Sequence, residues 1–224
     1  MDEVVTHCPT ALRRPTPIWL GAWLALLLVA PDWSGAQSTE QLVRDDGRMR
    51  GDPNAPVTLI EYSDFTCGYC GKFFRETWPR IQANYVQTGK VRFLYRDYPR
   101  AFRGPGLTAA VAARCAGDQS RYWVMHDRLF ESGVFTFAMF KHHATRIGLD
   151  LPSFTKCVRA GHHAGAIFED RAEGVKLGFR GTPGFLLLRT QGAGEDPAVS
   201  LPGAFPYEVF QEQIERLLGA PTEK

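Results

Sequence analysis

The sequence predicts an α/β fold whose sheet is interrupted along the chain by a helical insertion. A buried strand, an amphipathic helix and a second strand follow one another over residues 57–95. Residues 104–178 contain helical stretches and no convincing strand, and strand character returns at 184–188. The 224 residues, 44% hydrophobic and 22% charged, have the composition of one globular domain. A formal net charge of +2 gives no reason to expect nucleic-acid binding.

Residues 1–36 have the features of a secretory signal peptide. Two arginines precede an apolar run over 18–30, and small residues near position 36 favour cleavage after Ala36. An uncleaved signal anchor is the alternative. We therefore expect a periplasmic or otherwise exported protein, which would lose Cys8 with the signal and keep an even set of cysteines.

Residues 37–56 are predicted to form an N-terminal arm, and 57–103 the first part of the α/β fold. The arm ends in prolines and other turn formers, which suit an entry loop. Residues 57–63 are rich in β-branched and aromatic side chains, as in a buried strand. Apolar residues recur at helical spacing over 72–88, where a proline should bend the helix, and a second strand is expected at 91–95.

Residues 104–178 are predicted to form the helical insertion, and 179–224 the second part of the fold. Helical patterns occur at 107–116, 120–131, 138–147, 153–159 and 164–177. After the insertion we expect a strand at 184–188 and a partner strand at 198–201. Pro206 then opens a final amphipathic helix.

Cys67 and Cys70 form a Cys-X-X-Cys pair at the junction of the first strand and the helix. Such a pair is a redox-active dithiol, half of a zinc site or a structural disulfide. Zinc is disfavoured because there is no second such pair, and His142–His143 and His162–His163 are predicted to be solvated surface, so we expect no metal. In a dithiol, the helix N-terminus would stabilise a Cys67 thiolate, and Cys70, one turn later, would be the resolving thiol.

Three motifs occur in a fixed order along the chain. They are Gly-Asp-Pro-Asn-Ala-Pro-Val at 51–57, Glu-Tyr-Ser-Asp-Phe-Thr-Cys-Gly-Tyr-Cys at 61–70 and Gly-Thr-Pro-Gly at 181–184. With the helical insertion between the last two, the chain resembles the DsbA-like family of thioredoxin-fold thiol-disulfide oxidoreductases. The resemblance implies a thioredoxin fold with a helical insertion domain, and an enzyme that exchanges a disulfide between Cys67 and Cys70 with client proteins.

The resemblance also assigns roles to residues around the dithiol. Pro183 matches the family's cis-proline, so we expect a cis bond after Thr182, and client contacts at Thr182, Pro183 and Tyr69. Glu61 matches an acidic residue under the active site and is a candidate proton acceptor for Cys70. A strand glutamate that faces outward is the alternative, whereas a buried carboxylate would have a raised pKa.

The direction of electron flow stays open. Strong oxidants of this family typically carry a histidine between the two cysteines, whereas Gly68-Tyr69, together with Thr182, is similar to the disulfide isomerases of the superfamily. Dimeric members carry a substantial N-terminal dimerisation domain, and only residues 37–56 of the mature chain precede the first strand. A monomeric dithiol oxidase is therefore the first prediction, and an isomerase or reductase is the alternative.

A thioredoxin-like binding module without turnover is a third hypothesis. Its groove would be lined by aromatic residues, namely Phe65, Tyr69, Phe73, Phe179 and Phe185, although most of them are better suited to the core. Retention of both thiols and of the proline motif favours turnover.

Cys115 and Cys157 both lie in the insertion, and a structural disulfide between them is the simplest account of the second pair. Two buried free thiols are the alternative. We expect no bound cofactor, because the sulfur atoms themselves carry the electrons. The expected partners are client proteins with cysteines and a membrane or soluble redox protein that recycles the dithiol.

Overall fold

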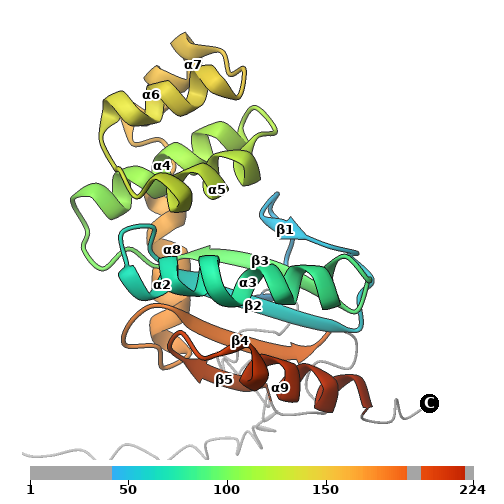
Figure 1. The fold of residues 1–224 in the computed structure, drawn as a ribbon. Helices are drawn as coiled ribbons and strands as arrows, with labels where there is room; N and C mark the ends of the chain where they lie inside the picture. The colour runs from blue at the N-terminus through green and yellow to red at the C-terminus, as the bar shows by residue number, and fades with distance from the viewer. Residues whose placement is uncertain (1–41, 191–197, 220–224) are drawn as a thin grey trace, which may run out of the picture. The chain divides into compact units, whose positions relative to one another are not determined.

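The computed structural model describes residues 42–190 and 198–219, and these form an α/β fold with a helical insertion, as predicted (Figure 1). Its strands are β1 (Met49–Arg50), β2 (Val57–Ser63), β3 (Val91–Asp97), β4 (Gly184–Arg189) and β5 (Val199–Pro202). They form one mixed sheet in the order β1-β3-β2-β4-β5, in which β2 and β3 are parallel and the other pairs antiparallel. The predicted signal peptide and its cleavage site lie outside the described residues.

Strand β1 is not predicted from the sequence. Met49 pairs with Leu94 and Arg50 with Phe93, so the N-terminal arm adds an edge strand to the sheet. Two residues are too few to show the alternation of apolar and polar side chains that identifies a strand. β1 is also fastened to the insertion, because Trp123 Nε1 donates to the Met49 carbonyl (2.9 Å) and the Arg50 guanidinium lies 4.3 Å from the Trp123 ring centroid.

One face of the sheet is covered by α2 (Gly68–Lys72), α3 (Trp78–Ile81) and α9 (Tyr207–Gly219), which lie in front of it in Figure 1. Strand residues such as Leu59 and Leu187 pack there against Phe73 and Phe210. Every second side chain of a strand points to the same face. Glu61 therefore shares the face of Leu59 and lies on the side of α2.

The helix that follows β2 begins at Gly68 with Cys67 as its N-cap, so Cys67 lies at the helix N-terminus as predicted. The helix contains two π-helical segments, η1 (Phe73–Thr77) before α3 and η2 (Gln82–Val86) after it. Pro79 lies in the first turn of α3. Because proline lacks an N–H and its ring collides with a carbonyl of the preceding turn, the wider π-helical turn before it relieves the conflict. Pro79, where a bend is predicted, thus lies at a local change of helix type.

The insertion consists of α4 (Pro105–Gly117), α5 (Tyr122–Ser132), α6 (Phe137–Arg146), α7 (Leu151–Ala160) and α8 (Ala164–Lys176). Each helix overlaps a predicted range. α8 extends past the other four to cover the second face of the sheet, where its Gly174 lies against the rings of Tyr62 and Tyr98 (Figure 1). Within residues 42–190 and 198–219, no helix combines the length and apolarity needed to cross a bilayer.

Candidate active site

A short turn places Cys67 at the N-terminus of α2, and Asp64 holds that turn. Asp64 Oδ1 accepts from the N–H and the hydroxyl of Thr66 (both 2.8 Å), and Oδ2 accepts from the N–H of Arg100 (2.9 Å). The Cys67 N–H donates to the Asp64 carbonyl (3.0 Å). An aspartate bonded to the backbone two residues later forms an Asx-turn. The dithiol is thereby tied to the end of a buried strand.

The pKa of Cys67 is lowered to about 5. A hydrogen bond from the Cys70 thiol is the largest cause, and Thr182 and the backbone N–H groups of Tyr69 and Cys70 lower it further. Cys67 is the N-cap of α2, so these N–H groups are among those that the first helical turn leaves unpaired. The neutral thiol donates instead to the Thr182 carbonyl (3.3 Å). At neutral pH Cys67 is therefore a thiolate, the nucleophilic form.

Cys70 has the opposite character. Its exposed fraction is 0%, against 7% for Cys67, and both residues are free thiols in the structure. Burial raises the pKa of Cys70, and the hydrogen bond to Cys67 and the negative charge of Glu61 raise it further. An ionised thiol beside a more deeply buried, protonated one can divide the work between attack and resolution.

Glu61 lies in the centre of the sheet, opposite Tyr95 of β3 and Phe185 of β4. It is 3% exposed, so the outward-facing alternative is wrong. Burial raises its pKa to about 8, against a lowering effect of Ser63. Its Oε1 has no hydrogen-bond partner among the described residues. Because its charge also raises the pKa of Cys70, the carboxyl lies within electrostatic range of the dithiol.

The loop before β4 forms the other side of the site. The Thr182–Pro183 peptide bond is cis, and the Thr182 carbonyl faces Cys67 Sγ. A cavity of about 450 Å³ is lined by Gly178 and residues 180–183 of this loop, and by Pro202 and Gly203 at the end of β5. The backbone before the proline thus borders both the thiol and an open cavity in which an extended segment can lie.

Tyr69 is the exposed aromatic side chain next to the dithiol, with an exposed fraction of 69%. The other four aromatic residues considered for a binding groove are buried: Phe65, Phe73, Phe179 and Phe185. They belong to the core, and Tyr69 alone of this set has an exposed side chain.

The second cysteine pair forms a disulfide. Cys115 of α4 and Cys157 of α7 are joined at an S–S distance of 1.98 Å and are 42 positions apart in the chain. Cys115 is buried, whereas Cys157 is partly exposed. This bond joins two helices of the insertion and lies outside the site around Cys67.

Three buried polar residues near the site are missing from the sequence prediction: Asp64, Tyr95 and His126. The Tyr95 hydroxyl and His126 Nε2 have no partner in the described part of the chain, and their rings lie 4.7 Å apart and pack against Phe65. Burial lowers the pKa of His126, which keeps the ring neutral. The Asp-X-Thr sequence before Cys67 could have indicated the Asx-turn, whereas His126 approaches only through the packing of α5.

A thioredoxin family model matches residues 44–193. The sequence of alpha-DsbA1 from Wolbachia pipientis is 26% identical to this chain, and its crystal structure matches with a TM-score of 0.72. The match covers 81% of this chain and 96% of that chain. This chain thus shares its fold with a solved protein over most of the length of both.

Two kinds of curated relatives match the sequence. The Na(+)/H(+) antiporter NhaA 1 of Salinispora arenicola is 35% identical over 146 residues, which are 64% of this chain and 22% of the antiporter. The probable disulfide bond formation protein D of Bacillus anthracis is 30% identical over 98 residues, which are 43% of this chain and 42% of that protein. The chain therefore spans less than half the length of either relative.

Proposed function

The chain belongs to the DsbA-like branch of the thioredoxin family, and on this basis we propose that it is an exported thiol-disulfide oxidoreductase that oxidises client dithiols. The observation that carries the proposal is the contrast between the two thiols: the pKa of Cys67 is lowered to about 5, while that of Cys70 is raised. A stabilised thiolate favours the reduced protein over its disulfide. The disulfide is therefore a stronger oxidant than an ordinary one.

Oxidation of a client proceeds through two exchanges. A client thiolate attacks Cys67 Sγ, a client–Cys67 bond forms, and the electron pair of the broken bond goes to Cys70. A second client thiolate then attacks the client sulfur of this mixed disulfide, and Cys67 leaves as its stable thiolate. Two electrons pass from the client to the protein, and a disulfide-bearing redox partner removes them.

Glu61 donates a proton to Cys70 when the disulfide opens and accepts it again when the disulfide re-forms. A buried thiolate is costly, so Cys70 needs a proton as it leaves. With a pKa of about 8, Glu61 is mostly protonated at neutral pH and can donate it. When the partner reoxidises the dithiol, the Glu61 carboxylate takes the proton back.

Thr182, Pro183 and Tyr69 bind the client in this proposal. The backbone before the cis-proline borders the thiol, and an extended client segment can pair with it in the adjoining cavity. Tyr69 projects its exposed ring beside Cys67 and can pack on an apolar client side chain.

Isomerase or reductase activity is the second candidate, and Gly68 and Tyr69 favour it. Neither residue adds a positive charge beside Cys67, so the thiolate depends on neutral hydrogen-bond donors alone. A less stabilised thiolate would bring the reduction potential of the disulfide closer to that of a reductase.

The equilibrium of the Cys67–Cys70 disulfide with glutathione tests the direction of transfer. We expect a reduction potential above about −200 mV, whereas a value near about −270 mV would indicate a reductase. The protein should accelerate the oxidative refolding of a reduced client with several disulfides more strongly than it accelerates the reduction of insulin. Cys67→Ser should abolish both activities, and Cys70→Ser should accumulate mixed disulfides with the client. If Cys67→Ser matches the wild type in both assays, the proposal fails.

A further inference from the structure

Four potential metal ligands converge where α4, α7 and α8 approach one another, outside the candidate active site. Cys115 lies in the last turn of α4, whose C-cap is Asp118, Cys157 belongs to α7, and His163 is the N-cap of α8. One ligand atom from each lies within 4.8 Å of all the others. Asp118 Oδ2 lies 2.9 Å from His163 Nε2 and 3.5 Å from Cys157 Sγ. The two sulfur atoms are joined as the disulfide described above.

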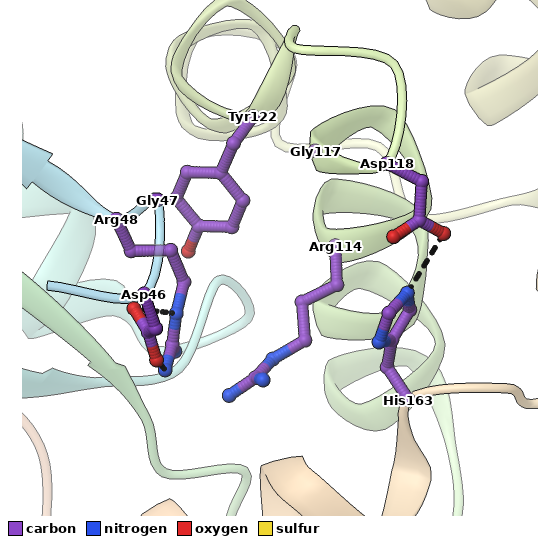
Figure 2. Close-up of a pocket in the computed structure, with 8 residues that line it drawn as sticks. All are labelled: Asp46, Gly47, Arg48, Arg114, Gly117, Asp118, Tyr122 and His163. Carbon is purple, nitrogen blue, oxygen red and sulfur yellow. Dashed lines mark hydrogen bonds and ion pairs between the residues drawn. The ribbon is translucent and has the colours of Figure 1, made fainter.

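The histidines of the doublets differ from the prediction. His163 and His143 were expected on the solvated surface, and this is wrong: His163 is partly buried and bonded to Asp118, and His143 is buried. His162 is exposed, as predicted. Figure 2 shows Asp118 and the His163 ring pointing toward each other from separate segments.

We propose that reduction of the Cys115–Cys157 disulfide turns this group into a zinc site, with both thiolates, Asp118 Oδ2 and His163 Nε2 as ligands. Zinc is bound by these donor types in tetrahedral sites at about 2.0–2.3 Å, which sets the ligand atoms about 3.3–3.8 Å apart. Asp118 Oδ2 is already near such spacings from His163 Nε2 (2.9 Å) and from Cys157 Sγ (3.5 Å). The two sulfur atoms must separate, and the other pairs, all within 4.8 Å, must adjust by changes of side-chain rotamer.

Reduction of the Cys115–Cys157 disulfide requires two electrons, and a dithiol can supply them. The dithiol gives two electrons to the Cys115–Cys157 bond and becomes a disulfide itself, while the two cysteines gain two protons. Zinc then displaces both protons and forms two Zn–S bonds, without changing its own oxidation state. The protein thereby exchanges one covalent link between α4 and α7 for a coordinate one.

Access and charge both suit this site. A cavity of about 150 Å³ is lined by Asp118 and His163, with Arg114 on the same wall (Figure 2), and Cys157 is partly exposed. Two thiolates and one carboxylate carry one more negative charge than zinc neutralises. Arg114 lies beside the site and is held by Asp97 and Asp170 (2.6 and 2.7 Å), so it does not repel the ion as an unpaired cation would.

Zinc titration of the full chain tests the proposal. Cys67→Ser and Cys70→Ser are introduced together so that the dithiol cannot bind metal, and the protein is reduced with a phosphine, which competes weakly for zinc. Competition with a chromogenic chelator should show about one zinc ion per reduced chain and none per oxidised chain. Cobalt in place of zinc should give the absorption of thiolate coordination. His163→Ala and Asp118→Ala should each weaken binding at least about tenfold, since loss of even an outer-shell partner costs that much.

His162→Ala is the matched control and should bind zinc as tightly as its parent. The proposal is overturned if the reduced chain binds no more zinc than the oxidised chain, or if His162→Ala and His163→Ala weaken binding equally. Should reduction unfold the insertion, zinc is expected to restore the helical circular-dichroism signal in His162→Ala and not in His163→Ala. Failure of zinc to restore it in His162→Ala also overturns the proposal.

Discussion

At the scale of single residues, burial and hydrogen bonding compete, and the outcome differs between Cys67 and Glu61. Both side chains are nearly inaccessible, and burial raises the pKa of each. Cys67 faces several donors at the start of a helix, and together they outweigh burial. Glu61 has only Ser63 to lower its pKa, so burial prevails. The nucleophile is ionised and the proton carrier is neutral at the same pH because of this difference in donors.

Glu61→Gln is expected to remove a pH dependence of stability. The folded pKa of Glu61 is about 8 and its ordinary value is 4.5, so the folded state holds the proton more tightly. The free energy of unfolding of the wild type should therefore fall as pH rises from about 4.5 to about 8. Glutamine does not ionise, so the variant should gain on the wild type between pH 5 and pH 8, as urea unfolding of the oxidised proteins would measure.

The control for this substitution is Glu76→Gln, at an exposed position of η1. It should keep the slope of the wild type. An equal fall of stability with pH in Glu61→Gln and in the wild type would show that Glu61 is not a buried acid with a raised pKa.

The roles proposed for single residues follow from sequence to different degrees. Cys67, Cys70 and Glu61 are found because motif and strand lie together in the chain. Tyr95 requires the pairing register, since it faces Glu61 from the neighbouring strand. His163 requires the positions of three helices, and no local pattern reports the approach of residues that far apart. Sequence therefore predicts the site around the dithiol and misses the cluster in the insertion.

At the scale of elements, apolar spacing predicts the existence of the helices and the long strands but not their details. β2 occupies the predicted range, because a run of β-branched residues is bounded on both sides by turn formers. The π-helical segments around α3 are not predicted, because apolar spacing does not distinguish a π-helical turn from an α-helical one. β1 is too short to carry a pattern.

Gly174→Ala tests the packing of α8 on the sheet. A Cβ at Gly174 would lie 2.8 Å from a ring carbon of Tyr98 and 2.9 Å from one of Tyr62, so buried rings must move. Overpacking of this kind costs about 1–3 kcal/mol, and over most of this range the cost exceeds the roughly 1 kcal/mol that alanine gains over glycine in a helix. Thermal unfolding should therefore show a lower melting temperature.

Gly165→Ala in the same helix is the control, since nothing lies within 4 Å of its added Cβ. It should raise stability by up to about 1 kcal/mol. Equal effects of the two substitutions would mean that α8 does not approach Tyr62 and Tyr98 as closely as described.

At the scale of the whole molecule, a buried ionic network joins the arm, the sheet and the insertion. Asp97 of β3 binds Arg48 (3.1 Å) and Arg114 (2.6 Å), and Asp170 of α8 binds the same two arginines (2.6 and 2.7 Å). Removal of one partner from such a network would leave an uncompensated buried charge. The insertion is predicted to end at residue 178. Its last helix, α8, nevertheless packs on the sheet, so α8 belongs to the insertion in sequence and to the sheet layer in space.

The two redox forms should differ in their response to pH. The folded pKa of Cys67 is about 5 and its ordinary value is 9.0, so its ionisation stabilises the reduced protein fully above pH 9. This contribution is lost as pH falls through about 5, and the oxidised form lacks it. As pH rises from 5 to 9, the free energy of unfolding of the reduced form should therefore increase relative to that of the oxidised form.

Urea unfolding of both forms would measure this difference. Cys115→Ser and Cys157→Ser are introduced together so that only the pair at Cys67 and Cys70 changes redox state. A stability gap that does not vary with pH would contradict the lowered pKa of Cys67, and with it the expected oxidising potential.

Strand β1 has a further consequence for a protein that handles unfolded clients. An open sheet edge offers unpaired N–H and C=O groups to any extended chain, and such strand addition is a route to co-aggregation. β1 occupies part of the β3 edge and is held there by Trp123. Under the proposed function, the arm thus prevents clients from adding a strand to the sheet at β3. Clients then pair with the backbone of the cis-proline loop instead.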